Sequence, residues 1–265
     1  MPDYLEVEEA KRHICAVGQK MYAKGFVAAN DGNITLRVGE DRVVATPTGV
    51  SKGAMTPEML ITVDLEGKLV AGDYKPTSEL PMHLAAYRNN AALRSTCHSH
   101  SPYLTAFAIA GLALDIPYSP ETVFITGSVP IAPFAIPGSP ELAQSIVPFV
   151  HDYNLVLLAN HGPMSWGGDA NAAWFVMESA ESYAKLCLIL RFMVGRSRPL
   201  MASQIQEQVE RFHLDASKAG HMAYSEEPCN QEPALALSDY HGPFLSDLDV
   251  ERIATRVAEK LAGNK

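Results

Sequence analysis

The spacing of apolar and polar positions along the chain predicts alternating helices and strands. Apolar residues recur at helical spacing over residues 6–24 and again over 169–194, where a long packing helix is expected. Apolar and polar residues alternate over 34–38, as in a half-buried strand, and 155–159 is an apolar run typical of a strand buried on both faces. Further helices are expected over 78–89, 101–110 and 139–150. Further strands are expected over 43–45, 93–100 and 129–134, and a hairpin over 60–70.

The pattern weakens after Gly195 and returns near the C-terminus. Ser246 opens a helix-capping sequence, and apolar residues between Val250 and Leu261 fall on one stripe of an amphipathic helix. Such a stripe must pack against another surface. That surface belongs either to this chain or to a neighbouring subunit.

Composition and charge exclude some classes of partner. The chain has 265 residues, of which 47% are hydrophobic and 19% charged, and this fits a soluble globular protein. Its net charge of −9 argues against a nucleic-acid partner, because phosphate backbones attract basic surfaces. No apolar run approaches the ~20 residues of a membrane span, and the acidic N-terminus lacks a signal-peptide stretch. Scattered cysteines without a Cys-x-x-Cys pair indicate reduced thiols, so we expect a cytoplasmic protein with no membrane partner.

Three histidines in two places are candidate metal ligands. His98 and His100 are two residues apart on a predicted strand, so their side chains point to the same face. His161 follows the buried strand over 155–159 at its C-terminal end. A His-x-His pair is only moderately specific, and a single histidine at a strand end is usually structural. Three neutral imidazoles would leave an open coordination position, as in a catalytic zinc site.

Glu79 lies upstream of these histidines and has two explanations. It is expected in the first turn of a helix that Ser78 caps, and carboxylates are common there because they favour the helix dipole. Structure alone therefore explains Glu79 about as well as chemistry does. His83 follows one helical turn later, and it either orients Glu79 or is a packed or surface histidine.

Two clusters of small residues are candidate anion-binding turns. The Asn-Asp-Gly-Asn sequence at 30–33 is either a simple loop or a turn whose backbone N–H groups and Asn side chain approach an anion. The Thr-Pro-Thr-Gly sequence at 46–49 is either an ordinary turn or a second donor cluster, with a Thr hydroxyl and an unobstructed Gly N–H. Farther along, a loop holds the phenol of Tyr118 and the carboxylate of Glu121.

Taken in order, these motifs resemble the class II aldolase/adducin family. The resemblance covers about residues 10–191. It is carried by residues 32–35, 46–49, 77–79, 98–100 and 160–162. Each segment is weak alone, but the ordered set is specific. The resemblance implies an α/β fold, a three-layer α/β/α sandwich with a mostly antiparallel central sheet. We expect one such domain over 1–265, with a C-terminal tail and helix over 195–265.

The resemblance also implies a role for each candidate residue. It implies Zn²⁺, or another divalent ion such as Mn²⁺ or Co²⁺, on the three histidines. Glu79 falls at the acid/base carboxylate, which can also ligate the resting metal. The implied metal ligands are His98, His100 and His161, and the implied phosphate cradle is Asn33, Thr48, Gly49, Thr77 and Ser78. Tyr118 and Glu121 compete for the role of second proton donor. Family members are commonly homotetramers with active sites at subunit interfaces, so we expect the same here.

The expected function is that of a metal-dependent lyase, a class II aldolase. A phosphorylated ketose like L-fuculose 1-phosphate would undergo reversible retro-aldol cleavage to dihydroxyacetone phosphate and an aldehyde, with the metal stabilising the enediolate. Glu79 would transfer protons beside the carbonyl, which is worth roughly 10²–10⁴-fold in rate. A sugar-phosphate 4-epimerase, a dehydratase and a 3-oxo-acid-phosphate decarboxylase are alternatives that use the same site. A non-enzymatic, adducin-like interaction module is the alternative from another class, although such a module would be expected to lose the metal ligands.

Overall fold

The computed structural model of this chain describes residues 4–214, so the helix predicted from Val250 to Leu261 lies outside the described part. The strands are β1 (Asn33–Gly39), β2 (Arg42–Ala45), β3 (Ile61–Val63), β4 (Leu69–Ala71), β5 (Ser95–His98), β6 (Ile131–Ala132), β7 (Leu155–Leu158) and β8 (Gly162–Gly167). They form an eight-stranded sheet in the order β4-β3-β2-β1-β5-β8-β7-β6. Strands β6 and β7 run parallel, and the other neighbouring pairs are antiparallel.

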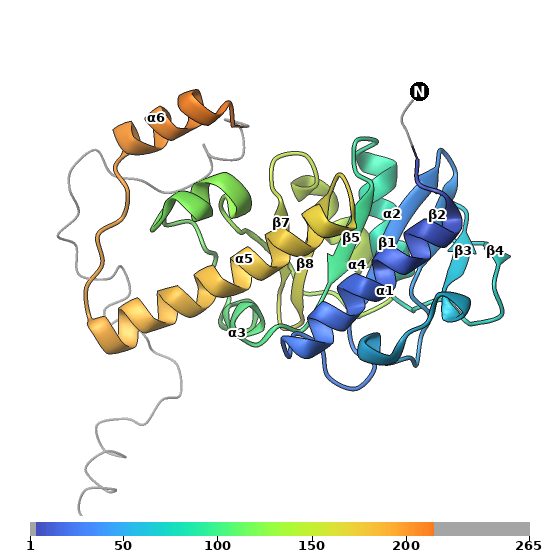
Figure 1. The fold of residues 1–265 in the computed structure, drawn as a ribbon. Helices are drawn as coiled ribbons and strands as arrows, with labels where there is room; N and C mark the ends of the chain where they lie inside the picture. The colour runs from blue at the N-terminus through green and yellow to red at the C-terminus, as the bar shows by residue number, and fades with distance from the viewer. Residues whose placement is uncertain (1–3, 215–265) are drawn as a thin grey trace, which may run out of the picture.

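Helices cover both faces of this sheet (Figure 1). The helices are α1 (Val7–Ala23), α2 (Leu80–Asn89), α3 (Pro102–Ala110), α4 (Pro140–Ser145), α5 (Ala170–Ile189) and α6 (Ala202–Phe212). Helices α1, α3 and α5 pack in one core on one face of the sheet, and α2 and α4 pack in a second core on the other. The predicted three-layer α/β/α sandwich with a mostly antiparallel sheet is therefore confirmed.

Alternation along the buried strands assigns their side chains to the two cores. Val44 of β2 and Leu157 of β7 join the core under α1 and α5. Val43 and Val156, one residue earlier on each strand, join the core under α2 and α4. All four side chains are fully buried. A continuous apolar run such as Leu155–Leu158 thus forms because a central strand needs an apolar side chain on each face.

Shorter helical segments connect these elements. They are η1 (Lys52–Ala54), η2 (Pro57–Met59), η3 (Thr122–Thr126), η4 (Val147–Phe149) and η5 (Leu190–Val194). The C-terminal half of α5 extends beyond the sheet, and α6 lies near η3 at that end of the molecule (Figure 1). Ile205 of α6 packs there against Val123 of η3. The sequence pattern does not predict α6, which follows the point where periodicity weakens.

Helix starts agree with most of the predicted caps. Ser139 accepts a hydrogen bond from the N–H of Leu142, and Asp169 accepts one from the N–H of Ala172. The predicted cap at Ser78 is wrong by one residue, because Glu79 occupies the N-cap position of α2. The helix predicted over 139–150 divides into α4 and η4, since a proline at position 148 removes a backbone donor.

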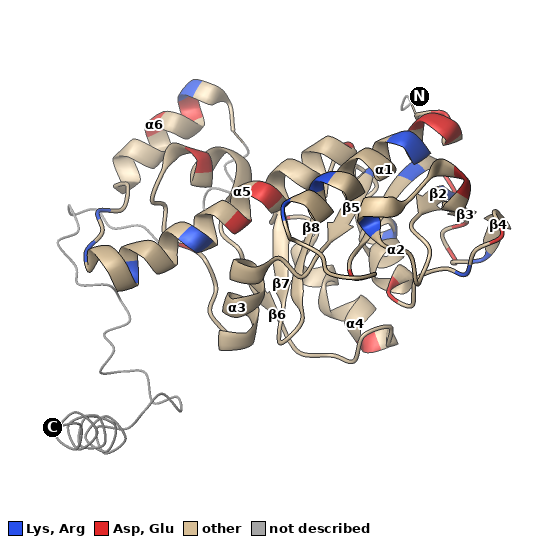
Figure 2. Cartoon of the chain, turned by 60° about the horizontal axis from the view of Figure 1, so that its bottom comes forward, with Lys and Arg blue, Asp and Glu red and all other residues tan. Residues whose placement is uncertain are grey.

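Charges of both signs are interspersed along α1 and α5 (Figure 2), as expected for solvated helix faces. Within residues 4–214, no helix combines the length and the apolar character that crossing a bilayer requires.

Candidate metal and active site

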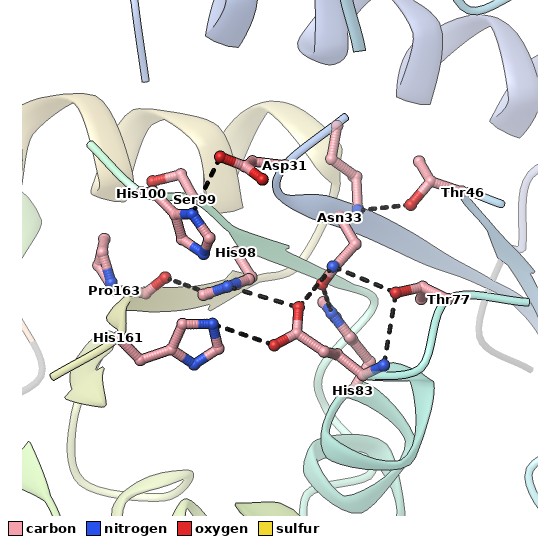
Figure 3. Close-up of polar contacts among 12 residues, drawn as sticks. Asp31, Asn33, Thr46, Thr77, His83, His98, Ser99, His100, His161 and Pro163 are labelled. Carbon is pink, nitrogen blue, oxygen red and sulfur yellow. Dashed lines mark hydrogen bonds and ion pairs between the residues drawn. The ribbon is translucent and has the colours of Figure 1, made fainter. Parts of the chain in front are cut away.

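Three histidine side chains meet beside the ends of the central strands (Figure 3). His98 is the last residue of β5, His100 follows two residues later, and His161 lies in the turn between β7 and β8. One ligand atom from each histidine lies within 4.8 Å of the other two. The ring centroids are 4.7, 5.1 and 5.1 Å apart. The structure therefore brings together the three candidate ligands that the sequence indicates.

The convergence depends on β8, which the sequence pattern does not predict. This strand pairs antiparallel with β5 on one side and with β7 on the other. The β7–β8 turn thereby places His161 beside the end of β5. Asn160 adopts φ 57° in this turn, a left-handed conformation that asparagine tolerates better than most residues.

Several nitrogens of the three histidine rings have no hydrogen-bond partner. The Nδ1–H of His98 donates to the carbonyl oxygen of Pro163 at 2.9 Å, and Nδ1 of His100 lies 3.3 Å from Oδ2 of Asp31. The Nε2 atoms of both rings are buried without a hydrogen-bond partner, and so is Nδ1 of His161. Leaving such an atom unpaired costs about 1–3 kcal/mol. These lone pairs fit a divalent metal ion, because metal-bound imidazoles commonly direct their other nitrogen to a carboxylate or carbonyl.

Glu79 directs its carboxylate at the histidines. Oε1 lies 3.1 Å from Nε2 of His161, and Oε2 lies 3.6 Å from Nε2 of His98. The side-chain amide of Asn33 donates to Oε2 at 2.8 Å. Although Glu79 is the N-cap residue of α2, its side chain makes no capping hydrogen bond. Helix capping therefore does not explain this carboxylate, which is only 8% exposed.

The surroundings of Glu79 and His98 determine the protonation state of each side chain. Burial alone raises the pKa of the Glu79 carboxyl, but attraction to His98 and contacts with His161 and Asn33 outweigh burial. The pKa of Glu79 therefore lies well below its usual value, and the carboxylate is ionised at neutral pH. Burial lowers the pKa of His98 to about 3, although Glu79 opposes this shift. His98 is therefore a neutral imidazole, which is the form that binds a metal ion.

Two glycines allow the histidine-bearing segments to approach each other. A Cβ atom on Gly162 would lie 2.4 Å from the carbonyl oxygen of Ser99, between the two histidine motifs. Gly32 has φ 72°, and a Cβ atom there would lie 2.8 Å from the carbonyl oxygen of His98. Any side chain at either position would push apart the backbone segments that carry the imidazoles.

The predicted phosphate cradle comes from neighbouring segments. The N–H of Thr48 donates to the carbonyl oxygen of Lys75 at 3.0 Å, which joins the loop after β2 to the loop before α2. The amide of Asn33 donates to Oγ1 of Thr77 at 3.3 Å, which joins β1 to the same loop. The exposed cradle residues are Thr48, Gly49 and Ser78. The loop that carries Thr77 and Ser78 is therefore joined to β1 and to the loop after β2, and the side chain of Asn33 is engaged with Thr77 and Glu79.

Tyr118 and Glu121 lie on a separate segment that leads into η3. The ring of Tyr118 packs against Tyr183 of α5 with centroids 6.3 Å apart, and Ser197 donates to its hydroxyl at 3.5 Å. Glu121 is exposed at the start of η3. Their role as second proton donor stays a prediction.

The sequence does not indicate the roles of two charged residues near the site. Asp31 belongs to the predicted turn at 30–33, and its carboxylate faces His100. Lys52 is 1% exposed, and its ammonium donates to the carbonyl oxygens of Asn30 and Val50, both at 2.8 Å. Burial lowers the pKa of Lys52 to about 8, although Asp31 and Glu79 oppose the shift. Lysines are almost never fully buried, so nothing in the local sequence indicates this position.

An α/β/α sandwich with clustered imidazoles and a buried carboxylate at the end of an antiparallel sheet is the class II aldolase type of fold and site. The chain belongs to this family, since the model of the Class II Aldolase and Adducin N-terminal domain matches residues 12–188.

Individual relatives differ in the activity that their names give. A 3-oxo-tetronate 4-phosphate decarboxylase of Pectobacterium atrosepticum is 35% identical over 187 residues, covering 69% of this chain and 85% of that protein. An L-fuculose phosphate aldolase of Methanococcus maripaludis is 34% identical over 170 residues, covering 64% of this chain and 91% of that protein. The structure of YgbL from Klebsiella pneumoniae has a TM-score of 0.71 and 31% identity, covering 77% of this chain and 99% of that one.

Proposed function

We propose that this protein is a divalent-metal-dependent lyase that decarboxylates a phosphorylated 3-oxo acid. The observation that carries the proposal is the cluster of three imidazoles with the carboxylate of Glu79 beside it. Several relatives at 32–35% identity are named 3-oxo-tetronate 4-phosphate decarboxylases, and they favour this reaction over the expected retro-aldol cleavage.

The three imidazoles are the proposed holders of the metal. His98, His100 and His161 would bind Zn²⁺, with Mn²⁺ or Co²⁺ as alternatives. A bound divalent ion supplies Lewis-acid stabilisation of negative charge that develops on a carbonyl oxygen. The absence of cysteine from the cluster and its count of three protein ligands support a catalytic rather than a structural site.

Neutral donors of the cradle would bind and orient the phosphate. The hydroxyl of Thr48 and the N–H of Gly49 are exposed beside the loop that carries Thr77 and Ser78. Asn33 would reach the phosphate by exchanging its long hydrogen bond with Thr77 for one to a phosphate oxygen. Fixing the phosphate in this way would hold the reacting carbon near Glu79, so that phosphate binding orients the substrate for reaction.

Glu79 would move the proton that decarboxylation requires. Loss of carbon dioxide breaks the bond between C1 and C2 and leaves its electron pair as an enediolate. The ionised carboxylate of Glu79 takes the proton of the C2 hydroxyl and returns it to the C2 carbon, and water reprotonates the oxygen. Proton transfer by a positioned side chain is worth roughly 10²–10⁴-fold in rate.

The count of proton-transfer groups supports decarboxylation. Retro-aldol cleavage needs a base at the C4 hydroxyl as well as an acid at C3, whereas decarboxylation needs protonation at one carbon. Glu79 lies at the histidine cluster, and Tyr118 and Glu121 come from the separate segment at η3. Retro-aldol cleavage of a 1-phospho-ketose is the second candidate, because relatives at 30% and 34% identity are named aldolases.

The experiment that tests the function compares two substrates on the zinc-loaded protein. We expect carbon dioxide release from 3-oxo-tetronate 4-phosphate to exceed aldehyde release from L-fuculose 1-phosphate in kcat/KM. Aldehyde release without carbon dioxide release would replace the decarboxylase by the aldolase. Absence of both products, with zinc bound, would contradict the lyase proposal.

We also propose that the protein is a cytoplasmic homotetramer and that its active sites lie at the subunit interfaces. Large apolar side chains support an interface beyond the sheet, because Phe192 is 61% and Met193 is 81% exposed at the end of the long helix. Light scattering coupled to size exclusion would contradict this part if it gave a monomer mass.

A further inference from the structure

A chain of buried hydrogen bonds leads from Glu79 into the interior of the protein. The amide of Asn33 bonds to Glu79, and its oxygen bonds to Nε2 of His83. Nδ1 of His83 is 2.6 Å from Oγ1 of Thr96. The series of hydrogen bonds continues on the other side of Thr96. Oγ1 of Thr35 lies 2.6 Å from Oγ1 of Thr96 and 2.7 Å from the hydroxyl of Tyr87. Its members come from α2, β1 and β5, so the chain crosses the layer between helix and sheet.

Hydrogen bonds set the orientation of the Asn33 side-chain amide, whose NH₂ group donates to Oε2 of Glu79. An amide nitrogen only donates, and an amide oxygen only accepts. The two amide hydrogens are then used by Oε2 of Glu79 and by Oγ1 of Thr77. The amide oxygen faces His83, and it can only accept. A flipped amide would place its oxygen against a carboxylate oxygen and its NH₂ group against the N–H of His83.

The same argument determines the tautomer of His83. Because the oxygen of Asn33 accepts, Nε2 of His83 must carry the proton, and a neutral ring then has a lone pair on Nδ1. Thr96 therefore donates to Nδ1. Burial keeps the ring neutral, since it lowers the pKa of His83 to about 4, while Glu79 alone opposes this shift.

The remaining hydroxyls follow in one direction. Since Thr96 already donates its hydroxyl hydrogen to His83, it accepts from Thr35, and Thr35 in turn accepts from Tyr87. The alternative acceptor for the hydroxyl of Tyr87 is the carbonyl oxygen of Arg94, which is farther away at 3.4 Å. Each group donates toward Glu79, and the sequence of donors has one consistent orientation.

We propose that His83 is a positioning residue that acts through Asn33 to hold Oε2 of Glu79 and leaves Oε1 as the oxygen that exchanges protons with substrate. Oε2 accepts from Asn33, whereas Oε1 faces the histidine cluster, 3.1 Å from Nε2 of His161. The hydrogen bonds of the His83 ring go to Asn33 and Thr96. This inference rests on the proposed function of Glu79 as the proton-transfer group.

A matched pair of substitutions separates positioning from packing. His83→Gln keeps a donor near the place of Nε2, whereas His83→Asn keeps a polar group near Nδ1 and removes the donor to Asn33. Loss of such an outer hydrogen bond typically lowers activity 10–100-fold. We expect kcat of His83→Asn to fall by about that factor, with KM and zinc stoichiometry unchanged, and His83→Gln to recover most of the activity. Equal losses in two folded variants would overturn the proposal.

A second measurement needs neither a variant nor turnover. Nitrogen-15 NMR of the intact, zinc-loaded protein reports which imidazole nitrogen of His83 carries the proton. We expect the neutral Nε2–H tautomer at pH 7. The Nδ1–H tautomer would leave Nε2 without a proton to donate to Asn33 and would overturn the inference. If the tautomer is as expected but no lyase activity exists, the proposed function fails and the hydrogen-bond chain stands.

Discussion

At the residue scale, the two oxygens of Glu79 have different surroundings, and this difference makes its chemistry testable. We expect Glu79→Gln to reduce turnover by roughly 10²–10⁴-fold, because the amide cannot take a proton from the substrate. The substitution keeps the shape and an oxygen that accepts from Asn33. Bound zinc, measured by elemental analysis, provides the control. Turnover within a few-fold of wild type, at full zinc occupancy, would exclude Glu79 as the proton-transfer group.

Asp31 is predicted to increase metal affinity through His100. Its carboxylate lies 3.3 Å from Nδ1 of that ring, and a carboxylate in this position raises the basicity of the opposite nitrogen. We expect Asp31→Asn to weaken zinc binding by roughly 10–100-fold in a competitive chelator titration. The matched control is Asp152→Asn, which changes an exposed carboxylate in the turn before β7. Equal zinc affinity in the two variants would show that Asp31 does not act on the metal site.

Sequence alone indicates the chemistry-bearing side chains better than those that support them. His98, His100 and Glu79 stand in short motifs that are weak alone, and the order of these motifs along the chain selects them through the family resemblance. Neither spacing nor residue type indicates Lys52, because its burial results from the packing of η1 against α1. The partner of His83 is equally hidden, since Asn33 is 50 residues away in the chain.

At the element scale, β8 shows why local patterns are insufficient. Its sequence begins and ends with glycine and includes a proline, which are signals of a turn. It is nevertheless a strand, because β5 and β7 each offer it a full ladder of hydrogen bonds. By contrast, β7 is predicted correctly from its four consecutive apolar residues. The strand conformation of β8 thus depends on partners that are distant in sequence, whereas that of β7 follows from the burial of its own side chains.

Close packing of β8 against the segment after β5 predicts a strong effect of Gly162→Ala. The added Cβ would lie 2.4 Å from the carbonyl oxygen of Ser99, so the two histidine-bearing segments must separate. We expect a loss of about 1–3 kcal/mol in the free energy of unfolding, and a lower zinc stoichiometry. The control is Gly168→Ala, where a Cβ meets nothing within 4 Å. If both variants match wild type in urea unfolding and zinc content, close packing at Gly162 does not hold the site together.

At the scale of the whole molecule, the site lies at the ends of the central strands, and its hydrogen-bond chain runs through the layer between the sheet and α2. Two apolar cores stabilise the sandwich on the two faces of the sheet. Polar groups are then buried between α2 and the sheet, and they are satisfied by one another. The order of motifs along the chain is sufficient to indicate this architecture. It does not indicate that the hydrogen bonds of the site extend through the layer.

Burial of neutral histidines makes the stability of the metal-free protein depend on pH. The pKa of His83 falls from 6.5 to about 4 on folding, so between these values the unfolded chain binds a proton that the folded protein excludes. Stability must therefore decrease as pH falls from about 6.5 toward 4, with the full contribution present above 6.5. We expect urea unfolding in the presence of a chelator to show this decrease, and to show a smaller one in His83→Gln, where the remaining histidines still contribute. Identical pH dependence in the two proteins would mean that the pKa of His83 does not change on folding, and burial would then not be what keeps its ring neutral.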